Sequence, residues 1–465
     1  MPPFRVFQHY VSPRSLALVL GDILILTTSI YVCDWIGMFG LPSIWLGDPP
    51  LFPKVSVFVA LGMLTFYVAG LYDYNPHLGR KETAVRVMAA AVVWGILFAA
   101  VSFLVPIFRL SRLASLIGFV VGTLGVMGLR SILSLQSTTV RFRERLLFLG
   151  ATPLADRLIS ELERYNPGYE ILGYVDERPA HEIALTNGFR ILGKAHQLKD
   201  IIAATEASTI VVALAERRGT FPMQAIMDCK LRGIRIEDWP TFYEKLTGKI
   251  VVQNLRPSWL VFSEGFNRTR VTRLVKRVVD LALSTLFLLL GWPIFLLVSL
   301  AIKLNSPGPL FFPQQRVGER GRTFRLLKFR TMVDDAEADT GPVWTSADDP
   351  RITRVGRLLR KTRLDEFPQI LNVLKGEMSF IGPRPERPHF VATLQDRIPY
   401  YSQRHTIKPG ITGWAQVRYR YGATIEDAEE KLQYDLYYVK NMSLFLDMLI
   451  LLSSIQVVLF GKGAR

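Results

Sequence analysis

Two adjacent carboxylates, those of Asp365 and Glu366, are the side chains of this sequence best placed for chemistry. Pro368 follows shortly after and is favourable in the first turn of a helix, so both acids would lie near the positive end of a helix dipole. That position keeps a carboxylate ionised, and an ionised carboxylate can attack a phosphate or bind magnesium. Acids also cap helices without any catalytic role, and the pair by itself favours that simpler interpretation.

Cationic side chains on nearby segments suit phosphate binding. Lys328 and Arg330 fall in a predicted strand over residues 322–330, where alternate side chains point to one face. Two cations aimed together can clamp a diphosphate, although a solvated basic face fits the pattern equally well. The turn Gly382–Pro385 is rigid and presents the guanidinium of Arg384, a group suited to bidentate phosphate recognition.

A basic segment leads up to the acid pair. Arginine recurs at every third position, with apolar residues between, at Arg351, Arg354, Arg357 and Arg360. A helix would separate the cations from the apolar side chains, and such a helix suits a membrane surface that carries anionic lipid. The acid pair is therefore expected beside a membrane.

Composition restricts the class of protein. The chain has 465 residues, of which 49% are hydrophobic, and a net charge of +16, so it is too long for a single core and strongly basic. A basic balance fits nucleic acid, anionic lipid or phosphorylated substrates. Nucleic acid is disfavoured because the cations lie beside membrane-seeking segments without interleaved aromatic residues. Cys33 and Cys229 are far apart, which argues against a disulfide framework and a cysteine zinc site.

The first third of the chain predicts four membrane helices. Each apolar run reaches or nearly reaches the roughly 20 residues that a bilayer requires. The runs are Leu16–Cys33, Val55–Leu71, Val87–Val105 and Leu113–Leu129. The loop Asp34–Pro53 has no Lys or Arg, so the positive-inside rule places both ends of the bundle in the cytoplasm. Asp22 lies inside the first run, where a polar packing contact is favoured over a functional role.

The middle third predicts an α/β domain. Apolar strands alternate with amphipathic helices, as is typical of a small parallel sheet, at Leu146–Leu149, Leu154–Arg164, Ile171–Val175, Gln197–Thr205 and Thr209–Leu214. The turn after the first strand resembles a dinucleotide fingerprint, but Thr152 replaces the glycine that lets the backbone approach a pyrophosphate. Asp176 lies at a plausible distance for a ribose-binding acid, yet a structural or regulatory Rossmann-like module is the favoured interpretation.

A fifth apolar run, Val278–Ile302, carries Pro293 at its middle, where proline removes a backbone hydrogen bond and bends a helix. Basic residues on both sides argue against transit to the outer face. A helix that enters the membrane and returns would keep the following domain cytoplasmic, whereas a plain span would move it outside. The pattern alone leaves both alternatives open. A last apolar helix, Phe445–Phe460, is short for a span and is expected to be buried or interfacial.

Five motifs follow one another in the last third, at Lys328–Met332, Leu364–Gln369, Asn372–Ser379, Gly382–Pro385 and Lys408–Gln416. Together they resemble the bacterial sugar transferase family, the monotopic polyprenyl-phosphate phosphoglycosyl transferases, from about Arg270 to the C-terminus. The preceding bundle and Rossmann-like domain are similar to those of the large members that initiate exopolysaccharide or O-antigen synthesis. Residues Arg256–Ser263 resemble the subgroup associated with exosortase (PEP-CTERM) systems.

The resemblance implies a phosphoglycosyl transferase of the bacterial inner membrane, with its catalytic domain on the cytoplasmic face. Asp365 would attack the β-phosphate of a UDP-sugar and release UMP, and undecaprenyl phosphate would take the phosphosugar from the covalent aspartyl intermediate. Glu366, with Asp365 beside it, would hold Mg²⁺. Phosphate would be contacted by Lys328, Arg330, Arg360 and Arg384. One-step transfer with Asp365 as base or metal ligand, and a non-catalytic scaffold or nucleotide sensor, stay open as alternatives.

The predicted architecture combines a transmembrane bundle over residues 1–140, a Rossmann-like α/β domain over 141–245, a linker over 246–270 and an α/β monotopic catalytic domain over 271–465. The family implies a re-entrant membrane helix over 272–304 with its break at Pro293. Many members have Ser-Pro at the break, and here Trp292 replaces the serine. Because the proline is kept, the bend is expected as well. The large members suggest a homodimer.

Overall fold

The structure is a computed structural model that describes residues 4–6, 9–11, 13–40, 51–72, 80–110, 112–136, 143–165, 168–178, 188–214, 221–253, 257–266, 269–333, 349–419, 422 and 424–460. Half of the predicted outer loop (41–50), Arg256 of the subgroup motif and parts of the predicted linker (254–256 and 267–268) lie outside the described residues. The chain forms two compact units, which meet in sequence between Thr247 and Gly248. The finer domain boundaries given above stay predictions.

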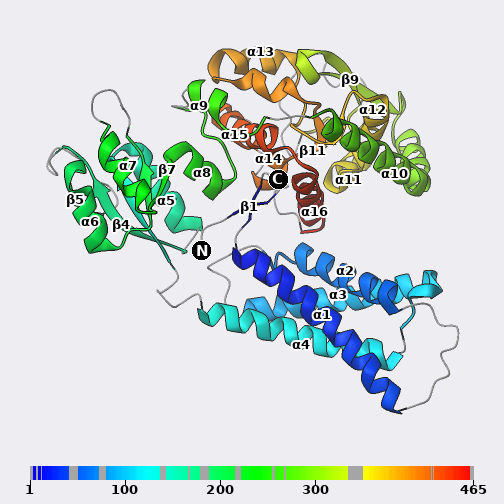
Figure 1. Cartoon of the computed structure of the whole chain (residues 1–465). Helices are drawn as coiled ribbons and strands as arrows, with labels where there is room; N and C mark the ends of the chain where they lie inside the picture. Colours follow the sequence, from blue (N-terminus) through cyan, green and yellow to red (C-terminus); the bar gives the residue numbers. More distant parts are fainter. Residues whose placement is uncertain are drawn as a thin grey trace. The chain divides into compact units, whose positions relative to one another are not determined.

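The first unit contains four long apolar helices, as the sequence predicts: α1 (Pro13–Gly40), α2 (Leu51–Val68), α3 (Arg80–Leu104) and α4 (Arg112–Gln136) (Figure 1). Each is long and apolar enough to cross a membrane. Phe58, Phe66 and Trp94 are fully enclosed between them. The expected polar contact of Asp22 is present: Arg130 donates to both of its carboxylate oxygens at 2.8 Å, and the Tyr72 hydroxyl donates at 2.7 Å.

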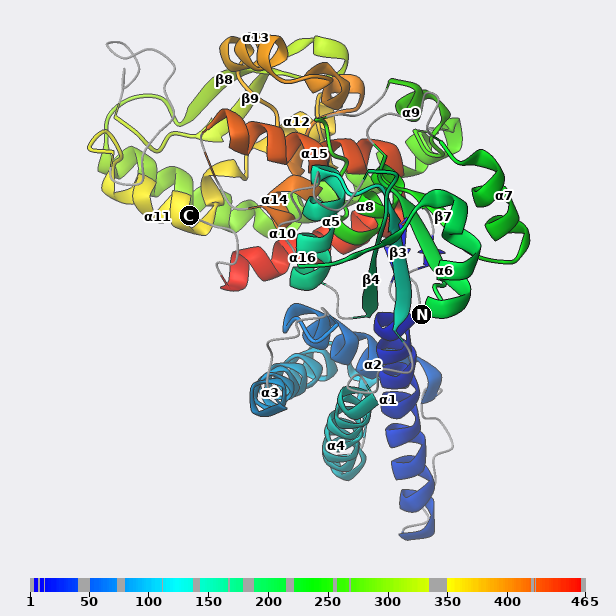
Figure 2. The same cartoon turned by 90° about the vertical axis from the view of Figure 1, so that its left-hand side faces the viewer.

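A five-stranded parallel sheet follows in the same unit, with strand order β5-β4-β3-β6-β7. Figure 2 labels three of its strands, β3, β4 and β7. Its strands are β3 (Glu144–Leu149), β4 (Tyr169–Val175), β5 (Ile191–Gly193), β6 (Thr209–Val212) and β7 (Arg235–Asp238). The accompanying helices are α5 (Pro153–Tyr165), α6 (Leu198–Thr205), α7 (Met223–Leu231) and α8 (Trp239–Thr247). The prediction of a parallel sheet is confirmed. The short outer strands β5 and β7 were not predicted, because three or four residues carry little pattern.

Other residues of the chain form hydrogen bonds with the turn that resembles a dinucleotide fingerprint. The Asp176 carboxylate accepts a hydrogen bond from the Ala151 amide at 2.7 Å, and Arg178 donates to the Ala151 carbonyl at 2.8 Å. The Thr152 hydroxyl donates to the Ala213 carbonyl at 2.8 Å. These bonds use the groups that a bound pyrophosphate or ribose would otherwise contact.

The second unit holds the acid pair. Its helices are α9 (Pro257–Phe262), α10 (Arg270–Asn305), α11 (Arg354–Thr362), α12 (Gln369–Lys375), α13 (Pro388–Arg397), α14 (Trp414–Arg418), α15 (Ile425–Asn441) and α16 (Leu444–Phe460). Strands β8 (Phe311–Val317) and β9 (Thr323–Phe329) form an antiparallel hairpin, and β10 (Ser379–Ile381) pairs in parallel with β11 (Gly410–Thr412). The larger of its apolar clusters includes side chains of α12, β10, α13 and α15.

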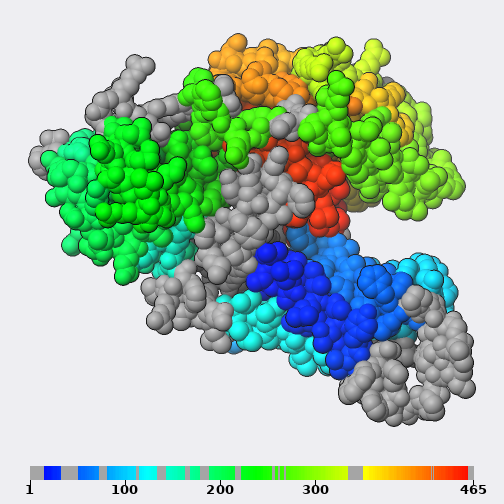
Figure 3. Space-filling model, viewed as in Figure 1, coloured from blue at the N-terminus to red at the C-terminus, as the bar shows by residue number. Residues whose placement is uncertain are grey.

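Helix α10 packs against other elements of this unit and stays helical through Pro293. It lies at the surface of its unit, drawn in yellow-green in Figure 3, and most of its apolar side chains are exposed. Polar side chains on its inner face bind other elements of the unit. Arg277 donates to the carbonyls of Val373 and Leu374 at the end of α12, and Asp280 accepts from the Ser379 hydroxyl and the Phe380 amide of β10.

Candidate active site

The acid pair lies in a separate turn between two helices. Arg363, with φ of 57°, ends α11 in a left-handed conformation, and the 3₁₀ turn η6 (Leu364–Glu366) follows at once. Pro368 is the N-cap of α12. The sequence therefore places the acids correctly ahead of this helix. The abrupt reversal at Arg363 brings them back toward the β8–β9 hairpin, which no local pattern indicates.

Glu366 is held by two cations from distant parts of the sequence. Arg384, from the turn after β10, donates to its Oε1 at 2.6 Å, and the Lys328 ammonium on β9 lies 3.4 Å from the same oxygen. Burial by itself would raise the pKa of Glu366, but Arg384 and Lys328 outweigh it and hold that pKa well below its usual range. Glu366 is therefore a fixed negative charge at neutral pH.

Asp365 has a different environment, although it is the adjacent residue. It is only 8% exposed, and none of the described residues forms a hydrogen bond or ion pair with its carboxylate. Burial raises its pKa above the ordinary value, and Glu366 adds to that effect, while Lys328, Arg360 and Arg384 oppose it. A buried carboxylate without hydrogen-bond donors keeps its lone pairs for an incoming group, as a nucleophile requires.

The two remaining predicted cations, Arg360 and Arg330, lie in different places. Arg360 lies beside the pair: its Nε donates to the Thr331 hydroxyl at 2.9 Å, and its charge lowers the pKa of Asp365. Arg330 does not join them. Its guanidinium donates to the carbonyls of Ser306 and Pro307 just past the end of α10, and it is buried there. Lys328 and Arg330 therefore do not act from one strand face as expected, because β9 ends at Phe329, before Arg330.

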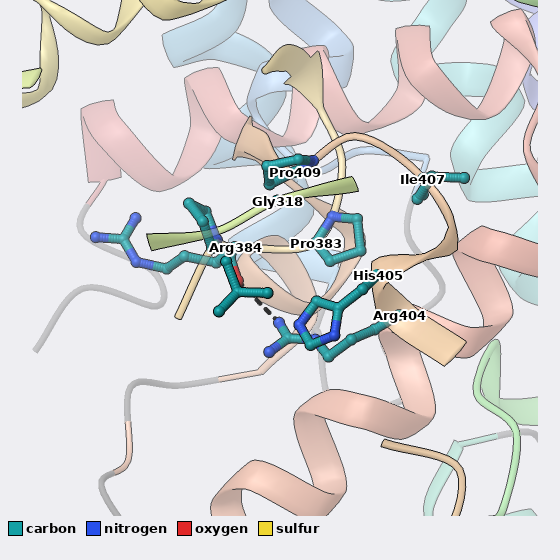
Figure 4. Close-up of a pocket in the computed structure, with 9 residues that line it drawn as sticks. Gly318, Pro383, Arg384, Arg404, His405, Ile407 and Pro409 are labelled. Atoms are coloured by element: carbon teal, nitrogen blue, oxygen red, sulfur yellow. Dashed lines mark hydrogen bonds between the residues drawn. The ribbon is translucent and has the colours of Figure 1, made fainter. Parts of the chain in front are cut away.

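Sequence reasoning missed the residues that hold the Arg384 turn. Arg404 donates to the Arg384 carbonyl at 2.9 Å, the dashed bond in Figure 4, while the Arg384 side chain extends away from it. Arg404 is itself fixed by the Asp435 carboxylate at 2.7 Å and by the Tyr401 hydroxyl at 2.8 Å. An arginine that binds a main-chain carbonyl twenty positions away leaves no periodic signal in the sequence.

A small pocket lies against this turn. Its lining includes Gly318, Pro383, Arg384, Arg404 and His405 (Figure 4). Burial lowers the pKa of His405 to about 4, so its imidazole is neutral at physiological pH. Neither Asp365 nor Glu366 is among the lining residues. The pocket is therefore lined by residues that hold the Arg384 turn, and it is not the site of the two carboxylates.

Among the described residues, Asp365 and Glu366 are the acidic ligands that this site offers to a metal, and no three His, Cys, Asp or Glu side chains of that part of the chain cluster as a metal site. Magnesium is often bound by one or two carboxylates together with substrate phosphates, so the donor set fits Mg²⁺ once a diphosphate is present. Among the described residues, both cations contact the same oxygen of Glu366, Oε1. The other oxygen and the Asp365 carboxylate are the available ligands.

Comparison with protein families adds two matches. A family described as "Bacterial sugar transferase" matches residues 271–461, which include α10 from its second residue on, the acid pair and all four predicted cations. A family described as "CoA-binding domain" matches residues 68–235, from the end of α2 to β7. The first match covers the site described above, and the second covers the parallel sheet and part of the helical bundle.

Three relatives illustrate the range of similar proteins. A protein from Aeromonas hydrophila named UDP-N-acetylgalactosamine-undecaprenyl-phosphate N-acetylgalactosaminephosphotransferase is 41% identical over 51% of this chain, and the match spans 55% of that relative's length. Two proteins are named UDP-glucose:undecaprenyl-phosphate glucose-1-phosphate transferase. The one from Xanthomonas campestris is 28% identical over 98% of this chain and 96% of its own length. The one from Escherichia coli is 33% identical over 70% of this chain and 69% of its own length.

Proposed function

The chain belongs to the bacterial sugar transferase family, and on that premise we propose that it transfers a sugar-1-phosphate from a UDP-sugar to undecaprenyl phosphate. It is an enzyme and a membrane protein. The observation that carries the proposal is the division of the acid pair: Glu366 is bound by Arg384 and Lys328, whereas the buried Asp365 beside it accepts no hydrogen bond from any described residue. The named relatives act on UDP-sugars of glucose or N-acetylgalactosamine, so either sugar is a candidate here.

Two displacements at one phosphorus account for the transfer. A carboxylate oxygen of Asp365 attacks the β-phosphorus, the bond to the oxygen that bridges the two phosphates breaks, and UMP leaves with the electron pair. The phosphosugar is then bonded to Asp365 as an acyl phosphate. A phosphate oxygen of the lipid attacks the same phosphorus and restores the carboxylate. Splitting the transfer in this way lets one nucleophile serve two substrates in turn.

The cations of the site would lower the cost of bringing anions together. Lys328 and Arg384 contact Glu366 and would meet the diphosphate at the acid pair, and the charge of Arg360 also acts on Asp365. Fixed cations aimed at developing phosphate charge stabilise the transition state without reorganisation. Glu366 and Asp365 would hold Mg²⁺, which when bound neutralises phosphate charge and polarises a phosphoryl oxygen.

The setting proposed for this reaction is the cytoplasmic face of the bacterial inner membrane, as the first membrane step of exopolysaccharide or O-antigen synthesis. Helix α10 would be re-entrant, because basic residues flank both ends and Pro293 lies near its middle. A homodimer belongs to the same proposal. The Rossmann-like domain would be structural or regulatory, because Asp176, Arg178 and Thr152 bind the groups of the glycine turn.

One assay tests the function. Purified protein, Mg²⁺ and undecaprenyl phosphate are incubated with a panel of UDP-sugars, and UMP release is measured. We expect turnover with one or a few sugars. Asp365→Asn should reduce it on the order of 10⁴-fold, as for the loss of a nucleophile, whereas Asp396→Asn, an exposed acid on α13, should leave it unchanged. A fully active Asp365→Asn protein would contradict the assignment.

Two further measurements separate the covalent route from its alternatives. Exchange of labelled UMP into UDP-sugar without lipid acceptor requires the first displacement to occur alone, and mass spectrometry should then find a phosphosugar on Asp365. If exchange needs the lipid, the transfer occurs in one step and Asp365 is a base or metal ligand. If no UDP-sugar supports UMP release, a scaffold or sensor role replaces the transferase.

A further inference from the structure

We propose that Gly291 of α10 is a positioning residue for the acid pair, because the absence of a side chain there admits the ring of Phe367. Phe367 directly follows Glu366, so contacts that fix its ring also fix the turn that carries both carboxylates. The inference rests on the proposed function, since it assigns a role in the same reaction.

The ring of Phe367 occupies the space that a side chain at position 291 would need. A Cβ atom added at Gly291 would lie 2.8 Å from Cε2 of Phe367 and closer still to its Cζ. Carbon atoms do not approach so closely without overlap, so either the ring or the helix would have to move. Phe295 lies one helical turn further along the same face of α10, and its ring centroid is 6.2 Å from that of Phe367. The Phe367 ring therefore contacts α10 on both sides of Pro293.

The exposure of the neighbouring residues supports a packing role for this glycine. Gly291 is buried, whereas Leu290 and Trp292 beside it are 71% and 57% exposed. Glycine is unfavourable in a helix interior relative to alanine, so a compensating contact is expected. In membrane helices, small residues occur where another element approaches the backbone closely. Here the approaching element is the residue next to the acid pair.

A displaced ring would move the carboxylates. The Phe367 amide donates to the Leu364 carbonyl at 3.2 Å, and the Phe367 carbonyl accepts from the Ile370 amide at 3.2 Å. Phe367 thus joins η6 to α12, and a shift of its ring would tilt the turn that presents Asp365. An error of about 1 Å in a reacting group can cost about 100-fold in rate. Binding of the UDP-sugar should suffer less, because the cations that meet the phosphates come from β9, α11 and the Arg384 turn.

Four proteins test the inference: the wild type, Gly291→Ala, Phe367→Leu and the double variant. For UMP release we expect Gly291→Ala to lower kcat about 30-fold while KM changes less than about threefold. Leucine removes the ring atoms that meet the new methyl group, so the double variant should recover to within about threefold of Phe367→Leu. Gly128→Ala in α4 is the matched control, because a Cβ atom there has no heavy atom within 4 Å.

Thermal unfolding of the same proteins, measured without substrate, distinguishes a loss of activity from a loss of folded protein. A wild-type level of kcat in Gly291→Ala overturns the proposal, and so does a double variant no more active than Gly291→Ala. A loss of activity that only follows the loss of folded protein reduces Gly291 to a structural role and overturns it as well. If the wild type releases no UMP from any UDP-sugar, the proposed function fails and the positioning role fails with it. The thermal unfolding of the four proteins still shows whether the side chains at positions 291 and 367 are matched in size.

Discussion

Two neighbouring acids acquire opposite properties because their partners differ. Glu366 has Arg384 and Lys328 within contact distance, which keep its pKa low despite burial. The buried Asp365 feels the same cations only through space, so burial prevails and its pKa rises. In a site of this kind, separated pKa values indicate separated roles. The assignment of Asp365 as nucleophile and Glu366 as metal ligand therefore gains support from the electrostatics as well as from family resemblance.

The pH dependence of kcat/KM for UMP release should show both perturbed groups. The reaction needs ionised Asp365, whose pKa lies above the ordinary 3.8, so activity should fall with acid at a higher pH than an ordinary aspartate would allow. Burial lowers the pKa of Lys328 below its ordinary 10.5, so the alkaline limb should begin below that value. A continuous UMP assay from pH 4 to pH 10 measures both limbs.

Two variants of Lys328 serve as controls for this profile. Lys328→Arg keeps the charge but cannot deprotonate in this range, so the alkaline limb should move to higher pH while the acid limb stays in place. Lys328→Met removes the cation that lowers the pKa of Asp365 most, so the acid limb should move to higher pH. An alkaline limb that is unchanged in Lys328→Arg would show that another group titrates there.

At the scale of elements, α11 connects a membrane-seeking surface to the site. Its inner side, with Leu359 at its centre, packs in one apolar cluster with Val298 and Ile302 of α10. Its outer side exposes Arg354, Arg357, Lys361 and, at 60%, Leu358. A leucine surrounded by cations on a helix packed against α10 suits the headgroup layer of a bilayer that contains anionic lipid.

This surface predicts a lipid-dependent signal. A polarity-sensitive dye attached to Leu358→Cys, in a chain whose Cys33 and Cys229 are replaced by serine, should shift to the blue in vesicles that contain phosphatidylglycerol. Changing Arg354, Arg357 and Lys361 to glutamine should abolish the shift, since each cation contributes about 1 kcal/mol near an anionic surface. The charge-matched control changes Arg322, Arg325 and Arg397, which are exposed elsewhere in the unit. An equal shift in purely zwitterionic vesicles would contradict the prediction.

The elements that the sequence predicts well are those with strong periodicity. The four apolar runs, α10, α11 and α16 lie close to their expected positions, because apolar stretches and spaced arginines are local signals. The contacts that build the site are not local. Lys328 reaches Glu366 because β9 packs beside η6, Arg330 turns to the end of α10 because its strand has already ended, and Arg404 acts through a main-chain carbonyl. Such contacts depend on the tertiary arrangement, so sequence patterns cannot specify them.

At the scale of the whole molecule, every proposed catalytic group lies in the second unit. The acid pair, its cations and α10 all follow Gly248, and so does the whole match to the sugar transferase family. The first few residues of the unit are part of its packing. The Gly248 carbonyl accepts from the Trp414 indole at 2.7 Å, Lys249 binds Glu430 at 2.6 Å, and the Ile250 amide donates to the Gln433 carbonyl at 3.0 Å.

A chain of residues 248–465 should therefore fold and keep the transfer activity. We expect the same sugar preference as the full chain, KM within about threefold and kcat within about tenfold, because the phosphate-binding cations and the nucleophile keep their contacts. A chain of residues 271–465 matches the family boundary but lacks the contacts of Gly248, Lys249 and Ile250, so its Tm should be lower. UMP release and thermal unfolding in detergent measure both quantities. If residues 248–465 fold but are inactive while the full chain turns over, the first unit must contribute to the reaction itself, and the site would not be contained within the second unit.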